Sequence, residues 1–577
     1  MTNAQAARIF EEIAVLLEIQ GEDAFRVNTY RKVARTVEDL ASDINDVAAR
    51  GELAKLPGIG KASAEKLSEL LTTGRLALRE ELRQHVPDTL LELLRVPSLG
   101  PRKAALLWRE VGVTSLAELK TAIDNGKLVG LKGFGAKTIE HFKHGIEFLE
   151  STAGRVRIGK AWPMAIYLRD AMRAQPGVSR CELAGSLRRG AETIGDLDLL
   201  CSAVDGPAAV RAFTAFPGVL QVLAAGDTKG SVLIELGNQR VQVDLRVVPA
   251  DSFGAAWQYF TGSKQHNVGV RERAVKRGWT LNEYGLYEGE RVIASKTEED
   301  IYAAMGLPWY PPELREDRFE FDLSAVPHDL ISLDHIRGDL HMHTTASDGR
   351  NSIAEMVAAA KARGYEIVCI TDHSQSSAIA NGLKPDRLMQ HIRDVREVAR
   401  RITGITVWVG AEVDILAEGR LDYGDDVLEQ LDFVVASVHV GMSQDRELNT
   451  RRTLAAIRNP FVNLIAHPSG RLINRREAMP LDVETIAKEA ARTGTSLEIN
   501  ASTYRLDLKD QHARLARDLG AKICIDTDAH STDQLDQMPF GVMTARRAGL
   551  LRGDVLNAQG PEAIREFVLA KRRHSAR

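Results

Sequence analysis

The feature that most constrains the fold is a repeat of short apolar runs in the second half of the chain. Each run has the length of a buried strand, and helical stretches alternate with the runs, which predicts a parallel barrel. The runs are 366–370, 406–409, 433–437, 463–466, 496–500 and 522–525. In such barrels the side chains that do chemistry stand at the carboxyl ends of the strands. A site in this half should therefore lie where these runs end.

Histidine, aspartate or glutamate follows almost every run. These residues are His341, His343, Asp348, Asp372, His373, Glu412, His439, His467, Asp528 and His530. A single histidine is more often a structural residue than a ligand, but a set that recurs from strand end to strand end indicates a metal site. Imidazole and carboxylate ligands without thiolate suit Mn²⁺, Fe²⁺ or Zn²⁺.

A second motif stands in the first half of the chain, where Gly185-Ser186-Leu187-Arg188-Arg189-Gly190 precedes Gly195-Asp196-Leu197-Asp198. A Gly-Ser turn with arginines can hold a triphosphate through backbone and guanidinium donors. Because Asp196 and Asp198 alternate with leucines, both carboxylates leave one face of a strand and can hold a magnesium ion. Residues 241–247 alternate in the same way and should bring in Asp244. An isolated Asp-x-Asp is usually a solvated edge strand or turn, and the combination with the Gly-Ser turn is more specific.

Three glycine-bearing turns, each before an amphipathic helix, recur in residues 1–150. They resemble helix-hairpin-helix motifs, whose glycines allow a phosphate to approach and whose helices present free N–H groups. Such contacts bind DNA without reading its sequence. A single turn of this kind can simply end a helix, but three copies favour DNA binding. The residues concerned are Gly58, Gly60, Lys61, Gly100, Lys103, Gly133 and Gly135.

Composition limits the class of protein. A length of 577 residues suggests about three to four domains. The net charge of -4 means that DNA must be bound by local basic patches. The four cysteines have no metal or disulfide spacing, which indicates buried thiols in a reducing compartment. No apolar run is long enough to cross a membrane, so we expect a cytoplasmic protein with no membrane partner.

Residues 1 to about 316 resemble a bacterial member of DNA polymerase family X, the family of the gap-filling polymerase beta. The resemblance rests on the first and second hairpin units, the Gly-Ser turn, the Asp-x-Asp strand, Asp244 and the run Tyr259-Phe260-Thr261-Gly262-Ser263. It implies a multidomain chain: a helical 5′-phosphate and lyase-type domain over 1–85, a helix-hairpin-helix DNA-grip (fingers) domain over 86–150, and an α+β nucleotidyltransferase palm and thumb over 151–317. A linker over 318–335 would follow.

The same resemblance implies roles for single residues in the palm and thumb. Asp196 and Asp198 would bind two Mg²⁺ or Mn²⁺ ions, and Asp244 would bind the catalytic ion and accept the proton of the primer hydroxyl. Arg189 and Ser186 would hold the phosphates of a dNTP. The remaining nucleotide or DNA contacts would come from Gly185, Gly195, Tyr259, Phe260, Gly262, Asn267 and Arg271.

In the N-terminal domain, Lys66 falls on the Schiff-base lysine of the family's lyase, and Arg26 and Tyr30 fall on its phosphate pocket. The chain departs from the family pattern nearby at Phe25 and Ala62. From the residues alone, Lys66 is an ordinary solvated lysine on a helix.

Residues 336–577 resemble a polymerase-and-histidinol-phosphatase (PHP) domain, a distorted (β/α) barrel. The resemblance implies three divalent ions, Mn²⁺, Zn²⁺ or Fe²⁺. The first would bind His341, His343, Glu412 and Asp528, the second Glu412, His439 and His467, and the third Asp348, His373 and His530. Asp372 would orient His373. The implied activity is phosphoesterase chemistry at a DNA 3′ end, as an exonuclease, a 3′-phosphatase or an abasic endonuclease.

The two halves together predict a monomeric repair polymerase that fills short gaps in base excision repair and also processes 3′ ends. Its partners would be dNTPs and gapped or nicked DNA with a 5′-phosphate. One alternative is a PHP phosphoesterase whose polymerase-like half only binds DNA, and another is a non-catalytic scaffold. The intact carboxylates Asp196, Asp198 and Asp244 argue against the first alternative, and the full PHP ligand set argues against the second.

Overall fold

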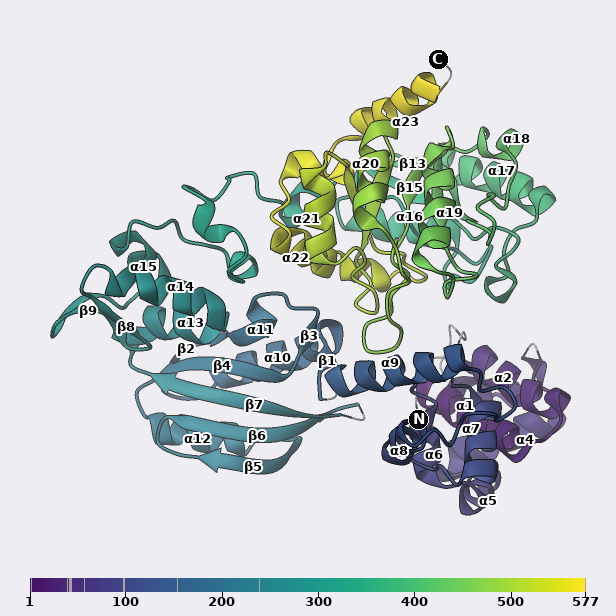
Figure 1. Ribbon diagram of the computed structural model, residues 1–577, viewed down its shortest axis with the longest axis horizontal. Helices are drawn as coiled ribbons and strands as arrows, with labels where there is room; N and C mark the ends of the chain where they lie inside the picture. The colour runs from purple at the N-terminus through teal and green to yellow at the C-terminus, as the bar shows by residue number, and fades with distance from the viewer. Residues whose placement is uncertain are drawn as a thin grey trace. The chain divides into compact units, whose positions relative to one another are not determined.

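The computed structural model describes residues 1, 3–38, 40, 44–56, 58–96, 99–152, 154–237 and 239–575. Pro57, Pro97 and Ser98, from the first two predicted glycine turns, lie outside these ranges. The chain divides into two compact units, Met1–Ala153 and Gly154–Arg577 (Figure 1). Each unit is described by itself.

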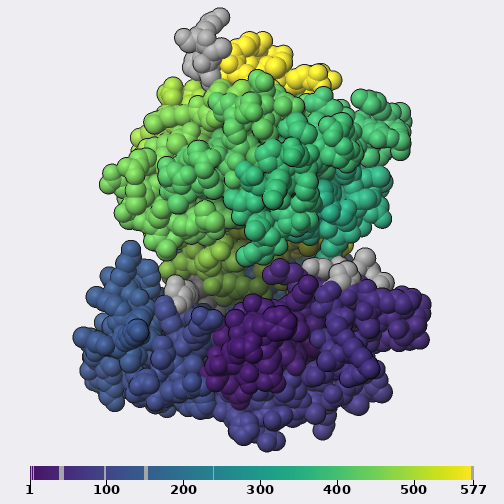
Figure 2. Space-filling view, turned by 90° about the vertical axis from the view of Figure 1, so that its right-hand side faces the viewer, coloured from purple at the N-terminus to yellow at the C-terminus, as the bar shows by residue number. Residues whose placement is uncertain are grey.

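The first unit is helical and forms one closely packed body, coloured purple to blue in Figure 2. Phe10, Ile13 and Leu17 from the first helix enter its core. Its α-helices are α1 (Asn3–Gln20), α2 (Ala24–Glu38), α3 (Ile44–Ala49), α4 (Lys61–Thr73), α5 (Ala77–His85), α6 (Asp88–Leu93), α7 (Pro101–Leu106), α8 (Leu116–Asp124) and α9 (Ala136–Thr152).

The predicted glycine turns stand where helices of this unit begin. Gly60 is the N-cap of α4 and Gly100 the N-cap of α7, and Gly135 directly precedes α9. Beyond Gly60, Gly100 and Gly135, no heavy atom of the described chain lies within 4 Å of an added Cβ. The space beside these three glycines is therefore open, as the close approach of a phosphate to such helix starts would require.

The second unit begins with a five-stranded mixed sheet in the order β2-β4-β7-β6-β5. Its strands are β2 (Val178–Leu183), β4 (Asp196–Ala203), β5 (Val219–Ala225), β6 (Lys229–Leu236) and β7 (Gln239–Val248). Strands β4 and β7 are parallel neighbours. Helices α10 (Ile158–Arg173) and α12 (Gly206–Thr214) share one hydrophobic core with Leu197 and Leu199 of β4. We call this part the palm.

The thumb follows, and it continues into the predicted linker. It contains α13 (Phe253–Thr261), α14 (Lys264–Val275), the small sheet of β8 (Thr280–Asn282), β9 (Gly285–Glu288) and β10 (Arg291–Ala294), and α15 (Glu298–Ala304). Glu320 is fully buried, with a carboxylate oxygen 2.8 Å from His266 Nδ1, and Phe321 stacks on the His266 ring. The first residues of the predicted linker are thus part of the thumb core.

The C-terminal part is the parallel barrel that the apolar runs predict. Its strands are β11 (Gly338–Asp339), β12 (Ile367–Ile370), β13 (Thr406–Asp414), β14 (Phe433–Ser437), β15 (Val462–Ile465), β16 (Ser496–Asn500) and β17 (Ile523–Asp526), paired in that order. The chain just after β11 also meets the chain just after β17, because His343 N–H donates to Ala529 O at 2.8 Å. The seven strands therefore approach a closed ring, and the fold prediction for this half is confirmed.

Helices surround these strands. They are α16 (Ile353–Ala362), α17 (Pro385–Arg401), α18 (Asp425–Leu428), α19 (Arg446–Arg458), α20 (Val483–Thr493), α21 (Asp510–Asp518), α22 (Met538–Arg547) and α23 (Pro561–Ser575). All four cysteines are free and buried, as predicted. Within the described ranges, no helix combines the length and apolar character needed to span a membrane.

Candidate functional sites

The palm carboxylates lie on neighbouring strands. Asp198 of β4 pairs in register with Asp244 of β7, and Asp196 precedes Asp198 by two residues on the same strand. Because Leu197, Leu199 and their counterparts in β7 enter the core, the three carboxylates leave the opposite face of the sheet. The alternation seen in the sequence therefore predicted their common direction correctly.

Electrostatic repulsion within this trio is strong. Burial, with the charges of Asp196 and Asp244, raises the pKa of Asp198 to about 7. The Ser231 hydroxyl and the Gln242 side-chain amide donate to Asp244 Oδ1 at 2.5 and 3.0 Å. Lys229 Nζ is 4.0 Å from the other Asp244 oxygen. A divalent cation would relieve this repulsion, so the donor set fits Mg²⁺ or Mn²⁺.

Gly185 makes the closest approach to the trio. Its φ is +60°, and a Cβ added there would lie 2.0 Å from Asp198 Oδ2. Only glycine fits both the backbone conformation and the space. The glycine of the Gly-Ser turn thus packs directly against a predicted metal ligand.

The two arginines of this turn have different partners. Arg188 pairs with the thumb residue Glu298: its Nη1 and Nη2 atoms donate to Glu298 Oε1 and Oε2 at 2.7 and 2.8 Å. The Arg188 guanidinium also stacks on Trp257. Arg189 Nε lies 3.0 Å from Glu316, and its Nη1 donates to Thr261 O at 2.6 Å. Arg189 is therefore paired with a carboxylate, which a phosphate would have to replace in the role predicted for this side chain.

The predicted sugar and base contacts lie around the end of α13. Tyr259 and Phe260 are in edge contact with ring centroids 5.1 Å apart. The Asn267 amide donates to Tyr259 O at 2.7 Å and accepts from Gln258 at 2.8 Å. Gly262 has a φ of +70° and adjoins Arg189. The remaining predicted contacts differ in exposure: Arg271 is exposed, whereas Ser186 and Gly195 are half-buried.

The predicted lyase residues are less well placed. Lys66 is half-buried on α4. Arg26 is paired with Glu22 at 2.8 Å, and Tyr30 is buried, with its ring against Phe10. Burial raises the pKa of Tyr30. Of the two predicted phosphate-binding side chains, Arg26 is therefore exposed and Tyr30 is buried.

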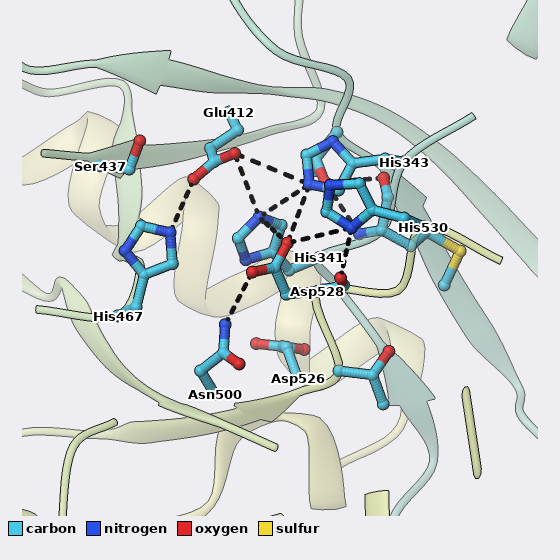
Figure 3. Close-up of polar contacts among 12 residues, drawn as sticks. His341, His343, Glu412, Ser437, His467, Asn500, Asp526, Asp528 and His530 are labelled. Carbon is cyan, nitrogen blue, oxygen red and sulfur yellow. Dashed lines mark hydrogen bonds and ion pairs between the residues drawn. The ribbon is translucent and has the colours of Figure 1, made fainter. Parts of the chain in front are cut away.

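The barrel gathers its predicted ligands into a single, largely buried site at the carboxyl ends of the strands. Figure 3 shows six of them: His341, His343, Glu412, His467, Asp528 and His530. Glu412 is central: its Oε1 is 3.0 Å from His467 Nε2, and its Oε2 is 2.8 Å from His373 Nδ1. Three groups of residues have possible metal-ligand atoms within 4.8 Å of one another. The first group is His343, Asp348, His373 and His530, the second is His341, His343 and Asp528, and the third is His373, Glu412 and His439.

This grouping overlaps the three ligand sets implied by the family resemblance but is not identical to them. His343 and His373 each belong to two groups, because their rings stack with centroids 4.3 Å apart, and His343 also stacks on His530 at 4.2 Å. The charge balance explains why this closeness is tolerated. Burial lowers the pKa of His341, but Asp528, Glu498 and Glu412 outweigh it and raise that pKa well above its usual value.

The cluster fits divalent cations. Glu412 Oε2 and His373 Nδ1 are both buried. They lie close together but without hydrogen-bond geometry, so neither atom has a hydrogen bond within the described chain. Burial and the charges of His530 and His373 lower the pKa of His343 to about 4, so this imidazole is neutral and can act as a ligand. Metal ions would supply the partners that these atoms lack.

Two carboxylates that the sequence argument missed support the ligands from behind. Glu498 Oε1 is 2.7 Å from His341 Nδ1, and Asp414 Oδ1 is 2.6 Å from His439 Nδ1. Each contact leaves the Nε2 atom of the imidazole for a metal and sets its orientation. The signals were present in the sequence: Glu498 interrupts an apolar strand, and Asp414 follows Glu412 by two residues on the same strand.

Asp372 has a different role from the predicted one. Its carboxylate accepts hydrogen bonds from Thr344 and Ser347 and lies 3.0 Å from His391 Nε2. It holds the segment that leads to Asp348, and within the described residues it makes no hydrogen bond to the ring of His373.

Comparison with known proteins connects these two sites. Over 97% of its length the chain is 37% identical to the DNA polymerase/3'-5' exonuclease PolX of Bacillus subtilis, of which it covers 98%. The chain belongs to the PolX family. Four family models match parts of it: a helix-hairpin-helix domain (1–76), a SAM-like helix-hairpin-helix tandem (90–141), the DNA polymerase beta thumb (256–316) and the PHP domain (339–502).

Smaller relatives match only part of this PolX-family chain. A probable phosphatase of Shewanella sediminis is 30% identical over 41% of the chain, which covers 94% of that protein. A probable phosphatase of Thermoanaerobacter is 29% identical over 41% of the chain and is covered to 95%. Membership of the family implies DNA binding and the use of divalent metals.

Proposed function

We propose that the chain adds dNTPs to a DNA 3′ end at the palm carboxylates and removes 3′-terminal nucleotides at the barrel cluster. The name of the Bacillus subtilis relative, which matches nearly the whole chain, includes both activities. The proposed polymerase activity is supported by the register of Asp198 with Asp244 on parallel strands. The proposed nuclease activity is supported by the cluster of histidines and carboxylates around Glu412.

At the palm, Asp196, Asp198 and Asp244 would hold two Mg²⁺ or Mn²⁺ ions. Such ions neutralise charge on the triphosphate and activate the primer hydroxyl. Asp244 is the acceptor proposed for the hydroxyl proton, and Ser231 and Gln242 hold its Oδ1 in place. Arg189, with the Ser186 turn, would bind the triphosphate in exchange for Glu316. Tyr259, Phe260 and Asn267 would then contact the sugar and base.

In the barrel, His341, His343, Asp348, His373, Glu412, His439, His467, Asp528 and His530 would hold three ions, Mn²⁺, Zn²⁺ or Fe²⁺. Ions of this kind supply a hydroxide at neutral pH and stabilise a leaving oxygen. Glu498 and Asp414 keep two of the imidazoles oriented for that task. The substrate that agrees with the attached polymerase is a DNA 3′ end.

The DNA would be gapped or nicked with a 5′-phosphate, and the enzyme a monomer acting in base excision repair. The open glycines of the three helix starts are the proposed backbone-phosphate contacts. We leave a lyase step at Lys66 outside this proposal, because Tyr30 is buried against Phe10.

The proposed domains are 1–85, 86–150, 151–317 and 336–577. Each of the four family-model matches falls inside one of them. The division of the chain at Ala153–Gly154 lies close to the second boundary. Because Glu320 and Phe321 belong to the thumb core, the free part of the 318–335 connection is shorter than the sequence suggested.

A single assay tests both activities. Gapped DNA with a labelled primer and a 5′-phosphate is incubated with Mg²⁺ or Mn²⁺, with and without dNTPs. Asp198→Asn with Asp244→Asn should abolish extension and leave 3′ degradation intact, whereas His343→Ala with Glu412→Ala should do the reverse. The exposed variants Asp227→Asn and Glu418→Gln are controls. Extension by the first double variant, or degradation by the second, would show that the site assignment is wrong.

A further inference from the structure

The metal cluster opens into a cavity of about 400 Å³ whose wall is only partly made of metal ligands. Besides Ser376, Ser377 and Asp414, the rest of the wall is apolar or cationic and comes from Ala378, Ile379, Ala380, Val440 and Arg505. A volume of this size is typical of a small-molecule or nucleotide pocket. These apolar and cationic residues differ in chemistry from the metal ligands, so their place in the same cavity needs an explanation.

The apolar part of the wall comes from two separate loops. Ile379, on the loop after β12, is 84% exposed, and Val440, on the loop after β14, is 40% exposed. Single exposed aliphatic residues are common on protein surfaces. Here two loops converge so that exposed aliphatic groups line the same cavity as the metal ligands.

The loop that carries Ile379 is held firmly. The hydroxyls of Ser376 and Ser377 donate to Asp414 Oδ2 at 2.5 and 2.9 Å, and Ser376 N–H donates to Asp422 at 2.7 Å. Asp414 is the same carboxylate that orients His439 through its other oxygen. Ile379 is therefore positioned relative to the metal cluster by a shared side chain.

Arg505 adds a cation to this cavity. Its side chain is 17% exposed and its Nε is 3.7 Å from Asp528 Oδ2. Its Nη1 atom is buried and lacks a hydrogen-bond partner within the described chain. A guanidinium left with a free donor beside a metal cluster suits a phosphate oxygen.

We infer that Ile379 and Val440 form a nucleobase subsite of the PHP active site. This inference rests on the proposed nuclease function and names the part of the substrate that the cavity takes. The 3′-terminal base packs its flat face on Ile379 while its phosphate lies at the metal cluster and Arg505. Apolar side chains are used in this way to part and support unstacked bases. The subsite makes the enzyme prefer an unpaired terminal nucleotide over a terminus that has no base.

The test compares two single-stranded oligonucleotides with identical internal sequences. One ends in thymidine and the other in an abasic tetrahydrofuran nucleotide, and release of the terminal unit is measured in Mn²⁺. Ile379→Ser should lower kcat/KM about tenfold for the thymidine end and leave the abasic end within twofold. Ile379→Phe should retain activity on the thymidine end. Leu569→Ser, which changes an exposed leucine outside the cavity, is the control.

The outcomes separate the inference from the proposed function. If wild-type enzyme releases neither terminal unit, the nuclease proposal itself fails. If wild-type enzyme and Ile379→Ser degrade both ends at equal rates, the nuclease stands and the base subsite is overturned. A parallel loss on both ends would also overturn it, because it would mean that the loop only supports the metal ligands.

Discussion

The palm trio and the barrel cluster differ in the charges that surround their carboxylates. In the palm, three carboxylates share an open sheet face, and Asp198 is left with a pKa of about 7. In the barrel, Glu412 is surrounded by imidazoles, which, against the effect of burial, lower its pKa well below the usual value. The palm site is therefore short of cations, whereas the barrel site supplies part of its own counter-charge.

The difference suggests how each site acquires its metals. An open carboxylate trio binds hard cations that exchange readily and arrive with the nucleotide. Buried imidazoles oriented by Glu498 and Asp414 form a preorganised site that retains its ions. The predictions below run from the largest expected effect to the smallest.

Removal of loosely bound metal should give the largest difference between primer extension and 3′ degradation. After gel filtration into metal-free buffer, extension should fall more than about 100-fold and return at once with Mg²⁺, because the palm ions exchange freely. Degradation of 3′ ends should persist, and elemental analysis should find metal still bound to the protein. His343→Ala with Glu412→Ala should lose that retained metal. Equal loss of both activities on gel filtration would remove the contrast between the sites.

Gly185→Ala should reduce extension about 100-fold and leave 3′ degradation unchanged. The new methyl group would stand 2.0 Å from Asp198 Oδ2 and displace a metal ligand. Gly177→Ala is the matched control, since Gly177 also has a positive φ, +79°, but open space around its Cβ position. Steady-state extension rates measure both. Similar losses in the two variants would point to backbone strain rather than to the clash.

Glu498→Gln should weaken metal retention and 3′ degradation by about 10- to 100-fold, with extension unaffected. The amide keeps the shape of the side chain but cannot hold the His341 imidazole as the carboxylate does. Titration with Mn²⁺ against nuclease rate gives the apparent affinity. The exposed Glu484→Gln serves as control. Full activity at the wild-type Mn²⁺ requirement would mean that Glu498 has no role in orienting the ligand.

Arg547→Ala tests whether the two sites are as independent as the comparison implies. Arg547, on α22 of the barrel, donates to Arg189 O at 2.8 Å and pairs with Glu316 at 2.8 Å. Its loss should raise KM for dNTP about threefold to tenfold, because the loop that carries Arg189 loses a support. The nuclease rate should not change, and Arg565→Ala is the exposed control. An unchanged KM would mean that the barrel does not assist nucleotide binding.

The smallest effect concerns Glu320 in the thumb core, which is neither a predicted metal ligand nor a predicted substrate contact. Burial opposes ionisation of Glu320, but His266 and nearby N–H donors outweigh it and lower its pKa to about 2, from 4.5. A lowered carboxylate pKa stabilises the fold above pH 4.5, and this stabilisation is lost as the pH falls toward 2. Glu320→Gln should therefore cost about 2 kcal/mol at pH 7 and progressively less below pH 4.5 in urea denaturation. A pH-independent difference would contradict the assignment.

Local periodicity predicted much of this molecule. Alternation of apolar and polar residues placed Asp196, Asp198 and Asp244 on one sheet face, and the apolar runs predicted the barrel and its strand ends. Both depend on side-chain direction along a single strand, which the order of residues determines. The helix starts at Gly60, Gly100 and Gly135 were likewise readable, because glycine is the residue that such turns favour.

Contacts between distant segments were not predictable in this way. The pairing of Glu498 with His341, the support of Arg189 by Arg547 and the link from Asp414 to the Ile379 loop each join parts of the chain that no local pattern relates. Many polar residues could have met these partners, and the choice depends on how whole strands and helices pack together. The sequence alone thus predicted the strand ends at which the candidate ligands stand and the common direction of the palm carboxylates. Which side chains stand behind them, and which apolar residues surround them, was decided only by the tertiary structure, because burial and charge pairing are properties of the packed chain.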